Sequence, residues 1–174
     1  MSGAWLYEHN VDNSARFVLG TVGANPLICV GVNPSTAAPG DPDLTVSKVM
    51  GFAERNGFDS WVMLNLYPQR STDPRGMHLV HEPALQEENE QHIAALLDGR
   101  PLTLLGAWGE LIATRSYLPQ LLAGIVAVTD ASDCEWVSIG DLLKSGHPRH
   151  PSRAGYALPL QRLDVTGYLR AIGV

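Results

Sequence analysis

The sequence has 174 residues, which fits one folded domain with a sizeable apolar core, and we expect a single domain over residues 1–174. Hydrophobic residues make up 45% and charged residues 17%, a balance that excludes a disordered chain. The formal net charge is −6, so the chain lacks the basic surplus typical of proteins that grip long duplex DNA. The N-terminus lacks the pattern of a signal peptide and no apolar run is long enough to cross a bilayer, which predicts a cytoplasmic protein without a membrane partner.

Apolar runs alternate with stretches of helical periodicity along the chain. Strands are predicted at residues 26–32, 61–66, 102–106 and 125–128, with a candidate fifth at 136–139. Helices are predicted at residues 43–57, 85–97, 110–122 and 164–172. The pattern predicts an α/β three-layer sandwich, in which helices cover both faces of a central, mostly parallel sheet of about four strands.

Four loops are expected at the carboxyl ends of these strands, where ligands bind in open α/β sheets. They span residues 33–43, 65–77, 107–109 and 139–153. The unusual residues of the sequence gather in these loops, so we expect them to form one binding site.

The first loop reads Gly-Val-Asn-Pro-Ser-Thr-Ala. Gly31 permits a close backbone approach, and Asn33 with Pro34 fixes an extended or turn geometry. Ser35 and Thr36 offer hydroxyl and backbone N–H donors to a substrate. A plain Asn-Pro turn without a ligand is the alternative.

The second loop begins with Asn65, which emerges from a buried strand and needs partners for both its acceptor and its donors. A nucleobase edge satisfies both at once, although the amide could instead tie down its own loop. Tyr67 and Arg70 are further candidates for substrate binding; the arginine could hold a phosphate or carboxylate, or pair with Asp73 on the surface. Trp108, after the third predicted strand, could stack on a base or pack in the core.

The late loop carries three cations and two histidines within ten residues, which favours local attraction of an anion. Its candidates for substrate binding are Lys144, His147, Arg149 and Ser152, together with His150. The two histidines could ligate a metal, but no third ligand stands at a clear spacing, so we expect no metal and no cofactor. A structural role is the alternative for His147.

The ordered motifs resemble those of a family of uncharacterised bacterial proteins over residues 6–158. More distantly, the pattern is similar to the uracil-DNA glycosylase-like superfamily, which has a parallel four-stranded α/β sandwich. Gly31-Val32-Asn33-Pro34 resembles the first motif of the mismatch-specific uracil glycosylases, and His150-Pro151-Ser152 resembles the late motif. Asn65 falls where the superfamily places its base-reading asparagine.

The resemblance implies hydrolysis of an N-glycosidic bond, with His150 donating to the leaving base and Asn33 positioning water. Many members use a carboxylate where this chain has Asn33, and an amide cannot act as a general base. The expected partner is a nucleobase, a nucleotide or a single-stranded nucleic acid, whereas the net charge disfavours duplex DNA. The alternatives are a non-catalytic module that binds a nucleotide or modified base, and a phosphate-directed hydrolase.

Overall fold

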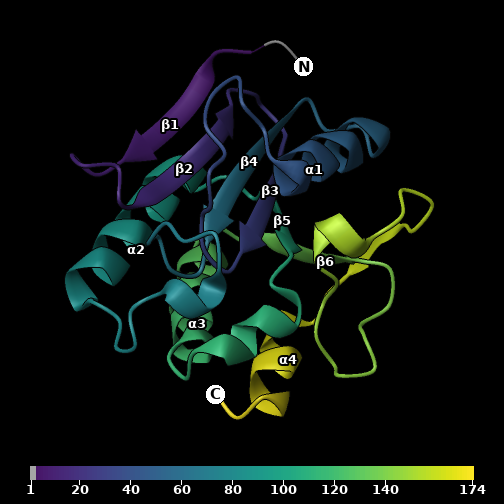
Figure 1. Ribbon diagram of the computed structural model, residues 1–174. Helices are drawn as coiled ribbons and strands as arrows, with labels where there is room; N and C mark the ends of the chain where they lie inside the picture. Colours follow the sequence, from purple (N-terminus) through teal and green to yellow (C-terminus); the bar gives the residue numbers. More distant parts are fainter. Residues whose placement is uncertain (1–2) are drawn as a thin grey trace.

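The computed structural model describes residues 3–174 and contains a seven-stranded sheet with helices on both faces (Figure 1). The strands are β1 (Trp5–His9), β2 (Arg16–Thr21), β3 (Pro26–Gly31), β4 (Ser60–Asn65), β5 (Thr103–Gly106), β6 (Glu135–Ile139) and β7 (Leu160–Arg162). The helices are α1 (Leu44–Arg55), α2 (Pro83–Leu97), α3 (Leu118–Asp130) and α4 (Val165–Ala171), with short 3₁₀ helices η1 (Pro74–Gly76), η2 (Gly109–Thr114) and η3 (Pro151–Arg153).

The strands lie in the order β1-β2-β4-β3-β5-β6-β7. The central strands β4, β3, β5 and β6 pair in parallel, whereas β1, β2 and β7 pair antiparallel toward the two edges. The mixed α/β class and the parallel centre are as expected, but the sheet is larger than the predicted four strands. The strands β1 and β7 are short and partly exposed, so neither shows the continuous apolar run of a buried strand.

The predicted strand at residues 125–128 is wrong, because these residues lie inside α3. A short apolar run fits a buried strand and a buried helix equally well. The buried side chains of α3 recur with the helical period, namely Leu118, Leu121, Leu122, Ile125, Val126 and Thr129. The predicted helix at 110–122 is divided accordingly: η2 covers its first part, and α3 begins only at Leu118.

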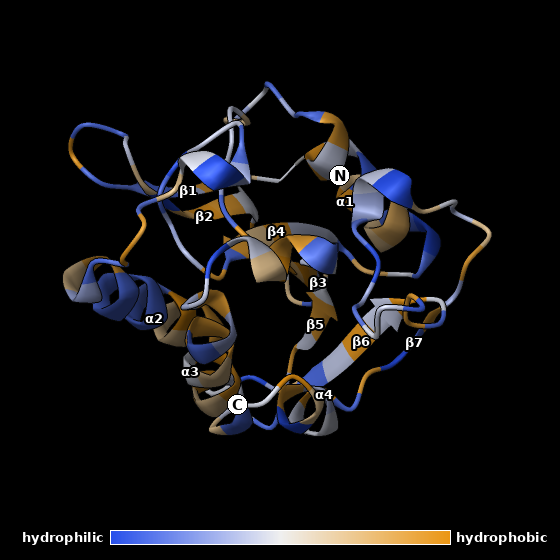
Figure 2. Ribbon diagram, turned by 60° about the horizontal axis from the view of Figure 1, so that its bottom comes forward, coloured by the Kyte–Doolittle hydropathy of each residue, from blue (hydrophilic) through white to orange (hydrophobic). Residues whose placement is uncertain are grey.

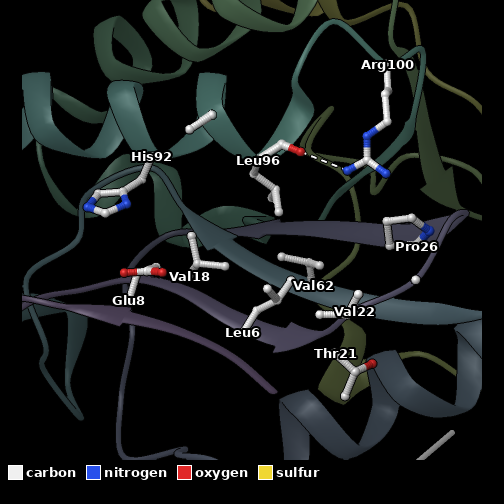
Figure 3. A pocket seen from close by; sticks show the side chains of 12 residues that line it. Leu6, Glu8, Val18, Thr21, Val22, Pro26, Val62, His92, Leu96 and Arg100 are labelled. Carbon is white, nitrogen blue, oxygen red and sulfur yellow. Dashed lines mark hydrogen bonds between the residues drawn. The ribbon is translucent and has the colours of Figure 1, made fainter. Parts of the chain in front are cut away.

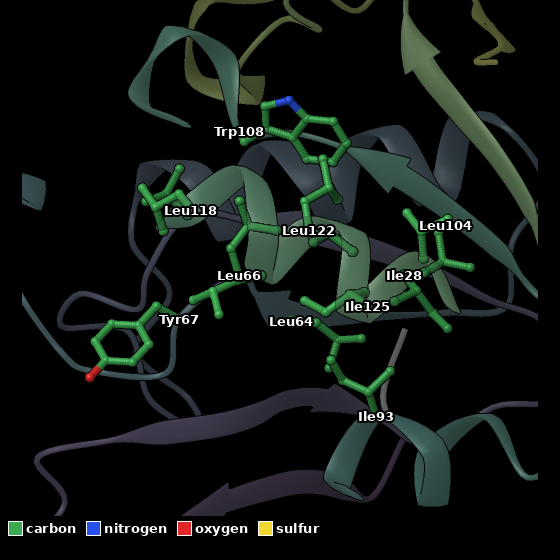
Figure 4. Close-up of a cluster of buried hydrophobic side chains, with 14 of the residues drawn as sticks. Ile28, Leu64, Leu66, Tyr67, Ile93, Leu104, Trp108, Leu118, Leu122 and Ile125 are labelled. Atoms are coloured by element: carbon green, nitrogen blue, oxygen red, sulfur yellow. The ribbon is translucent and has the colours of Figure 1, made fainter. Parts of the chain in front are cut away.

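The two faces of the sheet bury different sets of side chains, as alternation along a strand requires. On β3, Ile28 and Val30 belong to the core shared with α2, α3 and α4, part of which Figure 4 shows. Leu27 and Cys29 point to the opposite face, where they pack in the core beneath α1. Figure 2 shows hydrophobic β3 and β5 at the centre of the molecule and polar residues along α2. The result is three layers, with α1 on one face and the other helices on the second.

Across residues 3–174, every helix is too short or too polar to cross a membrane.

Replacing Leu122 with alanine is expected to lower the free energy of unfolding by about 2–5 kcal/mol, because the core cannot close the cavity. Leu122 is 0% exposed, whereas Leu79 is 81% exposed. Leu79→Ala removes the same atoms and is expected to change stability by no more than about 0.5 kcal/mol. Urea denaturation of both variants tests the packing of α3, and equal losses would contradict it.

Candidate functional site

A cavity of about 320 Å³ opens at the carboxyl edge of the parallel strands. The turns after β3 and β4 meet there, since the backbone N–H of Leu66 donates to Gly31 and that of Ser71 donates to Pro34. The cavity is lined by Arg16, Gly31, Val32, Asn33, Pro34, Ser35, Asp43, Leu44, Thr45, Val46, Met63, Asn65, Ser71, Thr72, Pro74, Leu111 and His150. The structure therefore brings Asn33, Asn65 and His150, which are far apart in the sequence, to one cavity.

Asn65 is the last residue of β4 and is 2% exposed. Its backbone carbonyl accepts a hydrogen bond of 2.9 Å from the side chain of Asn89 on α2, which fixes the end of the strand. Its side-chain Nδ2 is buried and has no hydrogen-bond partner among the described residues. A buried amide donor without a partner costs about 1–3 kcal/mol, so this group is unusual in a finished core. Asn65 thus presents a free donor at the cavity.

Gly31 lies opposite Asn65 in the pairing of β3 with β4. A Cβ atom at Gly31 would lie 3.2 Å from Oδ1 of Asn65, so the absence of a side chain leaves room for the amide. Asn33 is held differently: its Nδ2 donates to the carbonyl oxygens of Ser71, at 2.9 Å, and Pro34, at 3.1 Å. The side chain of Asn33 therefore ties two loops together, and its Oδ1 is the atom left to face a ligand.

His150 is half-buried and caps η3. Its Nδ1 accepts a hydrogen bond of 3.3 Å from the backbone N–H of Ser152 and lies 2.7 Å from the hydroxyl of the same residue. An Nδ1 that accepts from a backbone N–H places the proton of the neutral ring on Nε2. Burial lowers the pKa of His150, and the nearby Arg153 lowers it further. His150 is thus a neutral imidazole with an Nε2–H donor.

Asp43 supplies a carboxylate that the first motif lacks. It caps the N-terminus of α1, because Oδ1 accepts a hydrogen bond of 2.8 Å from the backbone N–H of Val46. Asp43 lies at the start of the predicted helix at 43–57, but it was not among the predicted site residues. Burial lowers the pKa values of both Arg16 and His150, and the charge of Asp43 opposes part of this shift in each.

Arg16 begins β2 and was not predicted as a site residue. It is 2% exposed, and its Nη1 donates to the carbonyl oxygen of Ala37 at 2.9 Å. Its Nε is buried without a partner, and no carboxylate of residues 3–174 lies within 4.0 Å of the guanidinium. Burial lowers the pKa of Arg16 to about 10, with a further contribution from Arg70, so the group is still charged near neutral pH. The cavity wall therefore contains an unpaired, buried cation.

A second, more open hollow adjoins the cavity and shares Ser35, Ser71 and Thr72 with it. Thr36 and Arg70, both predicted to bind substrate, line this hollow instead of the main cavity. Arg70 donates to the carbonyl of Ser35 and to the hydroxyl of Tyr7. Its hydrogen bonds hold the first loop in place, so Arg70 has a structural task beside any contact with a ligand.

Two aromatic residues predicted to bind substrate lie in the core. Tyr67 is 0% exposed, and its hydroxyl bonds to Nδ1 of His78 and accepts from the backbone of Glu82. Trp108 is also 0% exposed and donates through Nε1 to the hydroxyl of Tyr168. Neither lines the cavity, so the prediction that Trp108 stacks on a base is replaced by a packing role.

The cationic late loop contributes only His150 to the cavity. The ring of His147 bonds to the hydroxyl of Tyr168 at 2.7 Å, which is the structural alternative considered for it. Arg149 and Ser152 line a neighbouring cavity on the other side of His150, and Lys144 is exposed. Among residues 3–174, no group of three or more His, Cys, Asp or Glu side chains could hold a metal ion.

Another cavity, of about 370 Å³, lies between the β1–β2 hairpin and α2 (Figure 3). Apolar side chains such as Leu6, Val18 and Leu96 line most of it. Arg100 at its border donates to the carbonyl of Leu96, so its guanidinium already binds the C-terminal end of α2. The cavity at the carboxyl edge is the better candidate, because two residues with unpartnered buried nitrogen atoms, Asn65 and Arg16, line it, whereas the apolar cavity has only the hydroxyl of Thr21 among the described residues.

Residues 16–152 match the family described as "Protein of unknown function (DUF1643)", and the chain belongs to this family. No curated protein matches the sequence significantly. Among solved structures, an alpha/beta hydrolase from Novosphingobium aromaticivorans DSM 12444 is similar at 16% identity with a TM-score of 0.36. The alignment covers 84% of this chain and 48% of that one, so the chain spans about half the length of the hydrolase.

The lowered pKa of His150 predicts how stability depends on pH. The unfolded histidine, with an ordinary value of 6.5, binds protons more readily than the folded one. The free energy of unfolding should therefore fall as the pH decreases below about 6.5, until the folded ring is protonated as well. His150→Gln is expected to lose less stability than the wild type between about pH 7.5 and 5.5, measured by urea denaturation. Parallel pH profiles for the two proteins would contradict this assignment.

Proposed function

We propose that the cavity at the carboxyl edge binds a nucleobase, with Asn65 reading the edge of the base and His150 donating to a base oxygen. The observation that carries the proposal is the buried, unpartnered Nδ2 of Asn65 in the cavity wall. A base that carries a ring N–H beside a carbonyl oxygen offers one partner to Oδ1 and one to Nδ2 of this amide. The cavity volume, about 320 Å³, suits a small molecule of this size.

Hydrolysis of an N-glycosidic bond is the reaction that we propose for the bound ligand. The resemblance of the first and late motifs to the uracil-DNA glycosylase-like superfamily supports this reaction class. The neutral Nε2–H of His150 suits the oxygen of a leaving base, on which negative charge develops. Asn33 cannot accept a proton, but the carboxylate of Asp43 lies in the same cavity wall.

The proposed step balances with water as the only co-reactant. The water oxygen forms a bond to the anomeric carbon, and Asp43 takes the proton that the water loses. The carbon–nitrogen bond breaks, and its electron pair leaves with the base. His150 stabilises the base anion through Nε2–H until the base takes a proton from solvent.

Asn65→Leu is expected to weaken nucleobase binding without lowering stability. Loss of a two-point amide contact, worth about 1–3 kcal/mol, corresponds to a dissociation constant raised about 5- to 150-fold. The free energy of unfolding should stay level or rise, because the change removes a buried donor that has no partner. Titration calorimetry with uridine, guanosine and cytidine, together with thermal unfolding, measures both effects.

Asn25 provides the matched control, since it is exposed at the opposite edge of the sheet. Asn25→Leu should leave nucleoside binding unchanged. Equal affinities of wild type and Asn65→Leu for every nucleoside would overturn the proposed contact, as would the absence of any binding by the wild type.

Base release tests the proposed reaction separately from binding. Asp43→Asn keeps the helix cap, because asparagine caps as well as aspartate, and is expected to slow release about 10²- to 10⁴-fold through loss of the base. His150→Ala should cost about 10²- to 10³-fold through loss of one donor to the developing anion. Chromatography of bases released from nucleosides, nucleotides and single-stranded uracil-containing oligonucleotides provides the measurement.

Asp164 caps α4 in the way that Asp43 caps α1, so Asp164→Asn is the matched control and should release bases at the wild-type rate. Stoichiometric binding with no release by the wild type would replace the hydrolase by a non-catalytic binding module. Release that survives both Asp43→Asn and His150→Ala would remove these residues from the mechanism.

A further inference from the structure

The buried guanidinium of Arg16 is the feature that the proposed nucleobase contact leaves unused. It lines the same cavity, and its only hydrogen bond among residues 3–174 goes from Nη1 to the carbonyl oxygen of Ala37. Removing a cation from water costs several kcal/mol unless a counter-charge and hydrogen bonds compensate it. No carboxylate among the described residues forms an ion pair with Arg16. An anionic group of a ligand would therefore offset part of the free energy that burial of the guanidinium costs.

The groups around Arg16 favour a compact, multiply hydrogen-bonding anion. Ser35 and Thr72, which lie in the shared wall of the cavity and the adjoining hollow, add hydroxyl-bearing residues to the cavity that Arg16 lines. The N-terminus of the 12-residue helix α1 also opens into the cavity through Leu44 and Thr45. The positive end of a helix adds to the attraction of an anion. Asp43 opposes it, because its carboxylate is also part of the wall.

The strand order places Arg16 next to Asn65 and places His150 farther along the same edge of the sheet. Arg16 belongs to β2, which flanks β4 and its Asn65. His150 packs beside Gly109, just after β5, on the other side of β3. Asp43, the N-cap of α1, lines the same cavity. The cavity thus combines a cation, a carboxylate and hydrogen-bonding groups for a base.

We infer that the ligand is a free nucleoside monophosphate, with its phosphate at Arg16, its sugar near Asp43 and its base at Asn65 and His150. This inference rests on the proposed nucleobase site and names its substrate class. A terminal phosphate continues into one chain only, whereas an internal phosphate of a nucleic-acid strand needs room for the chain on both of its sides. Arg16 is 2% exposed, so the terminal phosphate of a free nucleotide fits it better.

Paired nucleoside and nucleotide titrations test the inference with the full chain. Uridine 5′-monophosphate or uridine 3′-monophosphate is expected to bind at least about tenfold more tightly than uridine, since charge-assisted hydrogen bonds to phosphate are strong. Arg16→Met should abolish that gain, measured as the ratio of the monophosphate and uridine affinities of the same variant. Guanosine and its monophosphates provide a second pair that has a ring N–H beside a carbonyl.

Two further variants keep the test decisive if Arg16→Met does not fold. Arg16→Lys retains the charge but loses the planar fork, so it should retain only part of the gain. Asp43→Asn keeps the helix cap and removes a repelling charge, so it should increase the gain several-fold. Arg162→Met, on the exposed surface of β7, and Asp164→Asn are the matched controls and should leave the gain at its wild-type size.

The outcomes separate this inference from the proposed nucleobase site. Tight uridine or guanosine binding with no gain from either phosphate would overturn the inference and leave the nucleobase site standing. A gain that is equal in the wild type, Arg16→Met, Arg16→Lys and Asp43→Asn would overturn it as well. The protein could instead bind inorganic phosphate and every monophosphate with the same affinity, and no nucleoside at all. That result would overturn both the nucleobase proposal and the inferred nucleotide ligand. A single-stranded oligonucleotide that binds more tightly than every monophosphate would overturn the choice of a free nucleotide.

Discussion

The parallel pairing of β3 with β4 places Gly31 opposite Asn65, and the geometry of the candidate site depends on this register. A shift by one residue would turn Asn65 to the other face of the sheet. A side chain at Gly31 would crowd the amide, since its Cβ would lie 3.2 Å from Oδ1. The same register joins the two turns, because the carbonyl of Gly31 accepts from the backbone of Leu66. The position of the free amide is therefore a consequence of how two buried strands pair.

The candidate site contains polar groups that weaken the empty protein. Nδ2 of Asn65 and Nε of Arg16 are both buried without partners among the described residues, and each costs free energy that an apolar side chain of similar size would not. Among the described residues, buried polar atoms of Thr21, Trp61, Asn89 and Arg149 also lack partners, but these four residues do not line the cavity. Residues that destabilise the fold while lining a cavity are typical of binding sites, where a ligand completes the hydrogen bonds. The contrast separates Asn65 and Arg16 from polar residues that merely hold the loops.

The sequence predicted the parallel centre of the sheet and part of the cavity lining for the same reason. Asn65 and His150 follow the ends of apolar strands, and the carboxyl ends of parallel strands meet at one edge. Arg16 escaped prediction because β2 runs antiparallel to β4, which brings the beginning of a strand to that edge. The aromatic candidates failed for a different reason: Tyr67 and Trp108 also follow strands, but large rings after a strand end can fold back into the core. Sequence order shows which edge a loop occupies, whereas tertiary packing decides which of its side chains reach the cavity.

The net charge of −6 is compatible with the proposed anionic ligand. The net charge sets the long-range field at the surface, whereas binding in the cavity depends on short-range contacts. A strand of nucleic acid meets many surface charges at once, and an acidic surface reduces the attraction of its phosphates. A single phosphate inside a cavity is governed by the few groups that touch it, since a low-dielectric wall strengthens their interaction. In the proposed complex, Asp43 opposes a phosphate that has no base to hold it, because its carboxylate is part of the same cavity wall. The balance between Arg16 and Asp43 thus favours a ligand that carries both a base and a phosphate over a free phosphate ion.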